Sequence, residues 1–430
     1  MKGDDILNLG KRIKNIRESK SLRQEDVFTG IVSSSHYSNI ESGRYNAATD
    51  TIKLIANRLD VPENYLLSSD INCNETQDLL EEYEFLVETD NIQATSTFLI
   101  QNKARLKYIP SINQEAYYQL ICFLHLLNSH KYKEALDLFE KYPMNEIQVS
   151  FEEKQRRIYL YASGIYYFMI NSHKNSIAFF KELLNISDDT SIYKPKVLYN
   201  IAMSLYNTYK FSEAIEYAKK SEILYLQLHE WVKVGDCYNL LVVLNRDIKN
   251  YKLAETYLEK GFNIVKPDSF ELLARLYHNS SLISFDKGNY KEALENVNRS
   301  IEIKSNKSIT GMFVSYKLKL NILLNIDDLL MINKTLKKAS KFIETKVHEA
   351  QFLYIEAKKY YILGGMDLYE TNIIKAIKIL QTQKSWKELI TVAEHYSSFL
   401  ERNKKYKKSL EFQKICTNSM KNMYEEEISL

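Results

Sequence analysis

The sequence predicts an all-α protein in which a small helical bundle is followed by a long array of helical hairpins. Only 11 Gly and 5 Pro interrupt the 430 residues. All five prolines fall in gaps between segments whose apolar residues recur at helical spacing. No segment alternates apolar and polar residues as a half-buried strand does. Helices therefore account for the periodic segments of the whole chain.

The first 67 residues divide into short helical segments. The first is amphipathic, with Ile6, Leu9, Ile13 and Ile16 at helical spacing, and it is followed by RQEDVFTG, SSSHYSNIE, TDTIKLIANRL and PENYLL. Five short helices in about 60 residues are typical of a small DNA-binding bundle. We therefore expect a separate domain over residues 1–67.

The third of these segments opens an unusual polar string, SSSHYSNIESGRYN. If Ser33 caps a helix, the i, i+3, i+4 spacing turns Tyr37, Ile40 and Glu41 inward. The glycine after this segment is expected to end the helix. The polar side chains that remain face outward, namely Ser34, Ser35 and Asn39, with His36 and Ser38 beside them.

This bundle resembles the helix-turn-helix family of phage-repressor type. The matching positions are Arg17, Leu22, Gln24, Glu25, Ile40, Glu41 and Gly43, within NIRESKSLRQEDV and SSHYSNIESGRYN. Arg23 departs from the family, which usually has a small hydroxyl residue there to cap the second helix. The turn GIVSSSH is one residue shorter than usual, as in a subset of peptide-regulated repressors. The resemblance implies an internal Arg17–Glu41 pair between the first and third helices.

The same resemblance places the third helix in the major groove of DNA. Asn39 could bond to N6 and N7 of an adenine, and His36 could donate to a guanine. Ser34 and Ser35 discriminate poorly between bases, so DNA shape is expected to contribute to specificity. The predicted phosphate contacts come from Gln24, Arg44 and Asn46, helped by Arg23. A bundle that binds only protein is the alternative.

After a polar linker at residues 68–76, residues 77–430 are expected to form a repeat domain. The phrase KYKEAL at 131–136 returns as NYKEAL at 289–294 and in looser forms elsewhere. A period of about 40 residues predicts nine helical hairpins. We take one residue early in each second helix as the repeat marker: Ala94, Ala135, Ala178, Ala214, Ala254 and Ala293, then the weaker Ile332, Thr371 and Ser409.

These units resemble tetratricopeptide repeats with lengthened helices. Because the period exceeds that of the standard repeat, an array of HEAT type is the alternative. A small residue early in the second helix favours the tetratricopeptide interpretation, since it lets two helices approach closely. Such hairpins stack into a right-handed superhelix, and its concave face, lined by first helices, is a binding surface.

Three asparagines recur at near-equivalent points of successive first helices. They are Asn200, Asn239 and Asn279, in the phrases LYNIA, CYNLL and YHNSS. An amide both donates and accepts, so a ladder of amides can bind the backbone of an extended peptide whatever its sequence. The alternative is that each asparagine bonds to a neighbouring helix backbone. The same argument suggests four weaker peptide-binding candidates, Arg246, Arg275, Tyr316 and Asn321.

A repressor-type bundle followed by about nine long repeats resembles the peptide-pheromone receptors grouped as Rap, Rgg, NprR, PlcR and PrgX, and the NprR type most. The resemblance implies a cytoplasmic quorum-sensing transcription regulator that binds a short imported oligopeptide in its repeat groove. It also implies a homodimer or higher homo-oligomer on double-stranded DNA with a palindromic operator. Two alternatives stay open: a peptide-sensing phage lysogeny regulator, and a scaffold that binds a response regulator or another phosphorelay protein.

Other classes of protein find no support in the sequence. A net charge of +3 is too small for a histone-like nucleic-acid binder. No CxxC pair occurs, and HEWVK lacks the second histidine of a zinc protease motif, so we expect neither metal nor other cofactor. The absence of a glycine-rich phosphate loop adds to the expectation that the chain is not an enzyme. The N-terminus is charged and no long apolar run occurs, so we expect no signal peptide and no membrane span.

Overall fold

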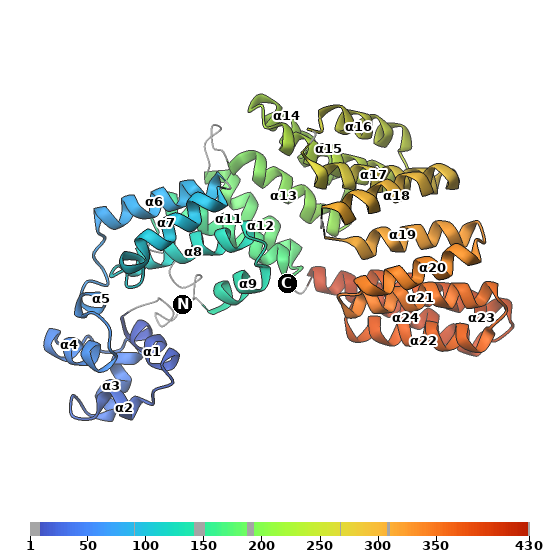
Figure 1. The fold of residues 1–430 in the computed structure, drawn as a ribbon. Helices are drawn as coiled ribbons and strands as arrows, with labels where there is room; N and C mark the ends of the chain where they lie inside the picture. The colour runs from blue at the N-terminus through green and yellow to red at the C-terminus, as the bar shows by residue number, and fades with distance from the viewer. Residues whose placement is uncertain are drawn as a thin grey trace. The chain divides into compact units, whose positions relative to one another are not determined.

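The computed structural model describes residues 9–89, 91–141, 151–186, 193–266, 268–307 and 310–428, with side chains through residue 423. Within these ranges every regular element is a helix and none is a strand, which confirms the predicted all-α class (Figure 1). The chain folds into two compact units. Unit 1 comprises Met1–Asn171 with Ala178–Asp188, and unit 2 comprises Ser172–Ile177 with Asp189–Leu430.

The N-terminal bundle, which we call the head, contains the expected five short helices. They are α1 (Leu9–Ser19), α2 (Gln24–Phe28), α3 (Ser34–Glu41), α4 (Thr49–Arg58) and α5 (Glu63–Leu67). Ile13, Val27, Tyr37, Ile55 and Leu66 are fully buried at its centre. The apolar spacing that predicted the helices is therefore the spacing of the core, although Ile6 lies outside the described residues.

Nine hairpins follow the head within the described residues, as the period predicts. Their helices are α6 (Asn74–Glu88) with α7 (Ile92–Leu106), α8 (Ile112–Asn128) with α9 (Tyr132–Lys141), α11 (Glu153–Met169) with α12 (His173–Ile186), α13 (Tyr193–Asn207) with α14 (Phe211–Gln227), α15 (Trp231–Asp247) with α16 (Tyr251–Ile264), α17 (Phe270–Asp286) with α18 (Tyr290–Asn306), α19 (Met312–Asn325) with α20 (Leu329–Ala339), α21 (Lys346–Ile362) with α22 (Met366–Thr382), and α23 (Trp386–Arg402) with α24 (Tyr406–Ile428). A short 3₁₀ helix, Ser340–Phe342, extends α20. No helix in the described ranges is long and apolar enough to cross a membrane.

The structure corrects three of the nine repeat markers. In every hairpin the buried residue early in the second helix donates its backbone N–H to the carbonyl four residues before it. Ala94, Ala178 and Thr371 do not occupy this position. The nine residues that do are Thr95, Ala135, Ser176, Ala214, Ala254, Ala293, Ile332, Tyr369 and Ser409.

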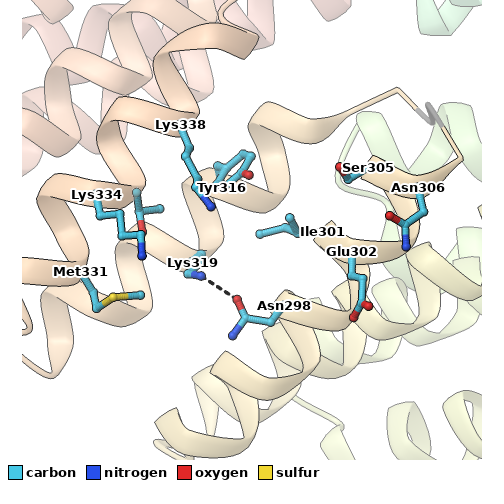
Figure 2. A pocket seen from close by; sticks show the side chains of 11 residues that line it. Asn298, Ile301, Glu302, Ser305, Asn306, Tyr316, Lys319, Met331, Lys334 and Lys338 are labelled. Carbon is cyan, nitrogen blue, oxygen red and sulfur yellow. Dashed lines mark hydrogen bonds between the residues drawn. The ribbon is translucent and has the colours of Figure 1, made fainter.

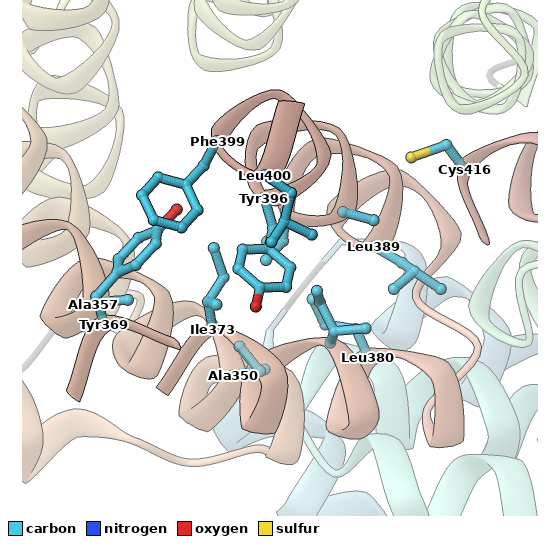
Figure 3. Close-up of a cluster of buried hydrophobic side chains, with 14 residues drawn as sticks. Ala350, Ala357, Tyr369, Ile373, Leu380, Leu389, Tyr396, Phe399, Leu400 and Cys416 are labelled. Atoms are coloured by element: carbon cyan, nitrogen blue, oxygen red, sulfur yellow. The ribbon is translucent and has the colours of Figure 1, made fainter. Parts of the chain in front are cut away.

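Burial against the first helix defines this position, and side-chain size does not. The Ser176 hydroxyl is buried because it pairs with the Ser204 hydroxyl at 3.1 Å. Tyr369 is fully buried in an apolar cluster to which α21 contributes the small, fully buried Ala350 and Ala357 (Figure 3). A search for alanine therefore found the repeat but misplaced its register in three units.

The predicted linker is bound along the second hairpin in unit 1. The Ile112 N–H donates to the Ser69 carbonyl at 2.9 Å. The Gln114 side chain bonds to both backbone groups of Cys73, at 2.8 and 3.0 Å. Because the segment between the head and α6 is held in this way, head and first hairpins lie in one compact unit.

A buried arginine strengthens this connection. Arg12 of α1 is 3% exposed, and its guanidinium lies 4.4 Å from the centroid of the Tyr65 ring. It donates to the Tyr65 carbonyl at 2.7 Å, to the Pro110 carbonyl, and to Glu115 Oε2 at 2.8 Å. The Tyr65 hydroxyl donates to the same carboxylate. We call Arg12, Tyr65 and Glu115 the joint, because they link the head to the start of α8.

Candidate functional site

The exposed face of α3 has the composition that its sequence predicts. Ser33 Oγ accepts the His36 N–H at 3.3 Å and so caps the helix. Tyr37, Ile40 and Glu41 are buried, and Gly43 ends the segment with φ of 72°. The side chains left in solvent on this helix are Ser34, Ser35, Ser38 and Asn39.

Arg23, Arg44 and Asn46 are exposed around this face. Asp26 accepts the Arg23 backbone N–H at 2.8 Å, so an acidic residue inside α2 caps the helix in place of the usual hydroxyl. This bond lowers the pKa of Asp26, and the Arg23 guanidinium beside it acts in the same direction. The exposed α3 residues with Arg44 and Asn46 form one polar surface, which we call the α3 face.

His36 lies differently from the outward position that the spacing predicts. Its ring is half-buried and packs edge-on against Tyr45, with centroids 4.4 Å apart. Its Nε2 is buried and has no hydrogen-bond partner among the described residues. A contact with guanine would require the ring to leave Tyr45.

Arg17 and Glu41 form the internal pair that the family resemblance implies. Arg17 Nε donates to Glu41 Oε1 at 2.6 Å, and a second guanidinium nitrogen donates to Oε2 at 3.2 Å. This bond raises the pKa of Arg17. Gln24 Nε2 also donates to Glu41 Oε2, at 2.6 Å, so its amide faces the interior network. A phosphate contact through Gln24 would have to use the second N–H of that amide or replace this bond.

The first helices of unit 2 bring polar side chains into a row. Along the array α13 contacts α15, α15 contacts α17, α17 contacts α19, and α19 contacts α21. Asn279 Nδ2 donates to Asn239 Oδ1 at 2.8 Å, so two of the three predicted asparagines are direct neighbours. Lys317 Nζ donates to Gln351 Oε1 at 3.2 Å, and Gln351 Nε2 donates to Glu388 Oε1 at 3.4 Å.

These contacts, together with the sequence register, define one side chain on each first helix. We call the set the amide row, and its members are Asn200, Asn239, Asn279, Lys317, Gln351 and Glu388. The sequence reasoning found its first half and missed its second. Lys317, Gln351 and Glu388 carry no shared residue type, so only the hydrogen bonds between helices reveal their register.

Salt bridges hold the two predicted arginines beside the row. Arg275 donates to Asp236 Oδ1 at 2.5 Å, from α17 to α15. Arg246 Nε donates to Asp286 Oδ2 at 2.7 Å, in the opposite direction between the same helices. Both guanidinium groups therefore connect neighbouring hairpins, and both lie on helices that carry a member of the amide row.

The remaining two candidates do not join the amide row. Tyr316 is one residue before Lys317, about 100° around the helix, and its ring stacks on Phe342 with centroids 5.5 Å apart. It lines a cavity of about 340 Å³ between α18, α19 and α20, together with Lys319, Lys334 and Lys338 (Figure 2). Asn321 follows Lys317 by one helical turn, and its carbonyl accepts from Asn325 Nδ2 at 2.8 Å.

The first and last hairpins of unit 2 lie close to each other. Lys387 Nζ at the start of α23 lies 5.2 Å from the centroid of the Tyr209 ring, which belongs to the turn after α13. The array of unit 2 thus curves until its first and last hairpins meet. Burial lowers the pKa of Lys317 and of His278, the latter to about 3, although both side chains are partly exposed.

One protein family and one individual protein are similar to this chain in sequence. Residues 13–66 match the helix-turn-helix family, which confirms that the head has this fold. The transcriptional activator NprA of Geobacillus stearothermophilus is 21% identical over 418 residues, which cover 92% of this chain and 98% of NprA.

Two solved structures share the repeat fold. A Rap protein complexed with competence and sporulation factor aligns with a TM-score of 0.67 at 16% identity, over 82% of this chain and 99% of its own. NprR in complex with its cognate peptide NprX aligns with a TM-score of 0.57 at 16% identity, over 79% of this chain and 99% of its own. Together, the comparisons show a helix-turn-helix head, similarity to NprA along nearly the whole chain, and a repeat fold shared with NprR and a Rap protein.

Proposed function

We propose that this protein is a quorum-sensing transcription regulator whose head binds promoter DNA and whose groove binds a short oligopeptide. The observation that carries the proposal is the presence, in one chain, of an exposed α3 face and of the amide row. The names of its relatives agree with both halves, since NprA is a transcriptional activator and NprR was solved with its cognate peptide. As a regulator that binds promoter DNA, the protein would act in the cytoplasm.

The head would read DNA with α3 in the major groove. Asn39 is exposed at the centre of the α3 face, where its amide can pair with an adenine edge. Arg44 and Asn46 would contact phosphates on either side of the base contacts. A single head offers one short recognition helix, so two heads on a palindromic operator would supply the area that selective binding needs.

The groove would hold the peptide through its backbone. Asn200, Asn239 and Asn279 carry amides at the spacing of successive first helices, and Gln351 adds a fourth. Asn279 is only 6% exposed, so its amide lies against Asn239 when no peptide is bound. The Asn239–Asn279 bond would be exchanged for bonds to peptide carbonyl and N–H groups. Exchange of this kind is favourable only when the peptide satisfies both amides, because a buried unpaired amide costs about 1 to 3 kcal/mol.

Titration of a promoter fragment with and without synthetic peptide tests the proposal. Candidate peptides are overlapping heptapeptides from short open reading frames beside the gene. One of them should change the Kd for DNA at least tenfold, and Asn239→Ala should abolish that change while leaving the Kd without peptide unaltered. Asn333→Ala on α20 is the matched control. An identical response in the Asn239 and Asn333 variants would contradict the groove assignment.

A scaffold that binds a phosphorelay protein is the second candidate, because the repeat fold is shared with a Rap protein. Retention of a response regulator by the immobilised full chain would support it. The two functions are separable, since loss of the α3 face should remove DNA binding alone.

A further inference from the structure

A cluster of one cationic and two aromatic side chains lies beside the amide row, on α21 and α23. Gln351, Tyr354 and Lys358 follow one another on α21 at i, i+3 and i+7 and therefore share a helix face. Lys358 Nζ lies 4.4 Å from the centroid of the Tyr354 ring. That ring lies 5.5 Å from the His395 ring of α23, at an interplanar angle of 72°. We call Tyr354, Lys358 and His395 the Lys358 cluster.

The charge of Lys358 is not compensated within the part of the chain that the structure describes. Arg275, Arg246 and Lys317 each donate to an oxygen on a neighbouring first helix. Lys358, by contrast, has no carboxylate oxygen within 4.0 Å among the described residues, and burial lowers the pKa of its ammonium group. Glu356 lies two residues away on the opposite side of the helix, beside Lys359.

His395 presents a second unsatisfied group at the same place. Burial lowers its pKa to about 4, and the positive charges of Lys358 and Arg402 act in the same direction. The imidazole is therefore neutral at neutral pH and carries a single N–H. Its Nδ1 is buried without a hydrogen-bond partner among the described side chains, whereas buried polar atoms are ordinarily bonded.

We infer that the Lys358 cluster is a subsite for a carboxylate group of the bound peptide. The inference rests on the proposed peptide-binding function. One carboxylate oxygen would accept from Lys358 Nζ and the other from the imidazole N–H, which gives two bonds of which one joins opposite charges. An anion here would compensate a desolvated ammonium group, while a cation or an uncharged amide would leave it unpaired.

The position of the cluster suits a peptide held by the amide row. Lys358 follows Gln351 by seven residues, so the two lie about 10 Å apart along the axis of α21. About three extended residues span that distance. Either the C-terminal carboxylate or an Asp or Glu side chain of the same peptide can therefore reach the cluster.

Retention of synthetic heptapeptide mixtures on the immobilised full-length protein tests the inference and separates these two sources. The first mixture lacks Asp and Glu and has a free C-terminal carboxylate. The second is the same mixture with a C-terminal amide, and the third adds one Asp or Glu to the amidated mixture. The first or the third should be retained at least tenfold more than the second, and the mixture that is retained identifies the source of the carboxylate.

Lys358→Gln should remove this preference without lowering the melting temperature, because it deletes a charge that has no carboxylate partner. Lys359→Gln is the matched control, since Lys359 Nζ lies 4.4 Å from the centroid of the Tyr360 ring and donates to Asn333 Oδ1 at 3.4 Å. Equal retention of all three mixtures by the wild type would overturn the subsite alone, as would an unchanged preference in Lys358→Gln. Retention of no mixture would overturn the peptide-binding function as well.

Discussion

At the scale of single residues, the α3 face separates base reading from phosphate binding. Asn39→Ala should reduce discrimination at one base pair by about 1 to 3 kcal/mol, because one bidentate contact is lost. Arg44→Ala should weaken binding to all sequences alike and lower the slope of log K against log salt by about one. Fluorescence anisotropy on operator and random DNA, at several salt concentrations, measures both effects. Equal losses on the two DNAs for both variants would contradict this division.

A second prediction at this scale concerns Glu41, which is 4% exposed and accepts from both Arg17 and Gln24. Glu41→Gln removes the buried carboxylate that pairs with the Arg17 guanidinium and leaves only the exposed Glu18 beside it, so it should destabilise the head by about 3 to 5 kcal/mol. Glu25→Gln is the control, since the Arg23–Glu25 pair is exposed and 3.8 Å long. Urea unfolding of the two purified full-length variants measures the loss of stability in each. Equal unfolding midpoints for Glu41→Gln and Glu25→Gln would refute the role of the Arg17–Glu41 pair.

Between elements, the head depends on the close approach of α1 and α3. A Cβ built on Gly10 would meet the backbone oxygen of Ile40 and lie 2.9 Å from that of Glu41. Backbone atoms cannot move aside as a flexible side chain does, so Gly10→Ala should separate the two helices and cost several kcal/mol. Gly30→Ala, where no atom lies within 4 Å, should cost only about 1 kcal/mol for its φ of 78°. Thermal unfolding should therefore rank the two variants far apart, and similar melting temperatures would refute the close contact.

Sequence spacing predicts well the helices whose buried residues recur every three or four positions. Five head helices, nine hairpins and the Arg17–Glu41 pair follow from helical spacing or from family resemblance, and the structure confirms them in its described ranges. Three repeat markers were misplaced because a serine, a threonine or a tyrosine can fill a position that elsewhere takes alanine. Lys317 escaped notice because lysine usually lies in solvent, and only its bond to α21 places it in the amide row.

For the whole repeat array, two partly exposed histidines whose pKa is lowered by desolvation predict acid sensitivity. The folded-state pKa is about 3 for His278 and about 4 for His395, against about 6.5 in the unfolded chain. The unfolded state therefore binds more protons as pH falls below about 6.5, so stability is lost on acidification at up to roughly 1.4 kcal/mol per pH unit for each histidine. The melting temperature of the double variant His278→Gln with His395→Gln should vary less between pH 7 and 5 than that of the wild type. Parallel curves would contradict the assignment.

The joint links the head to the first hairpins through contacts that sequence inspection could not reveal. The acceptors of Arg12 are 53 to 103 residues away along the chain. The charged and polar groups of Arg12, Tyr65 and Glu115 lose their contact with water, and only their bonds to one another compensate that loss. We therefore expect the head and the first hairpins to unfold in one transition. Arg12→Met should leave Glu115 without its cation, and calorimetry should then show the head melting separately, with faster proteolysis at residues 68–73. Arg105→Met is the control, because its pair with Glu75 is exposed and 3.8 Å long.

If peptide regulates DNA binding through this connection, Arg12→Met should also abolish the effect of peptide on the Kd for DNA while both ligands still bind. A single unchanged transition with intact regulation would show that the signal passes by another route.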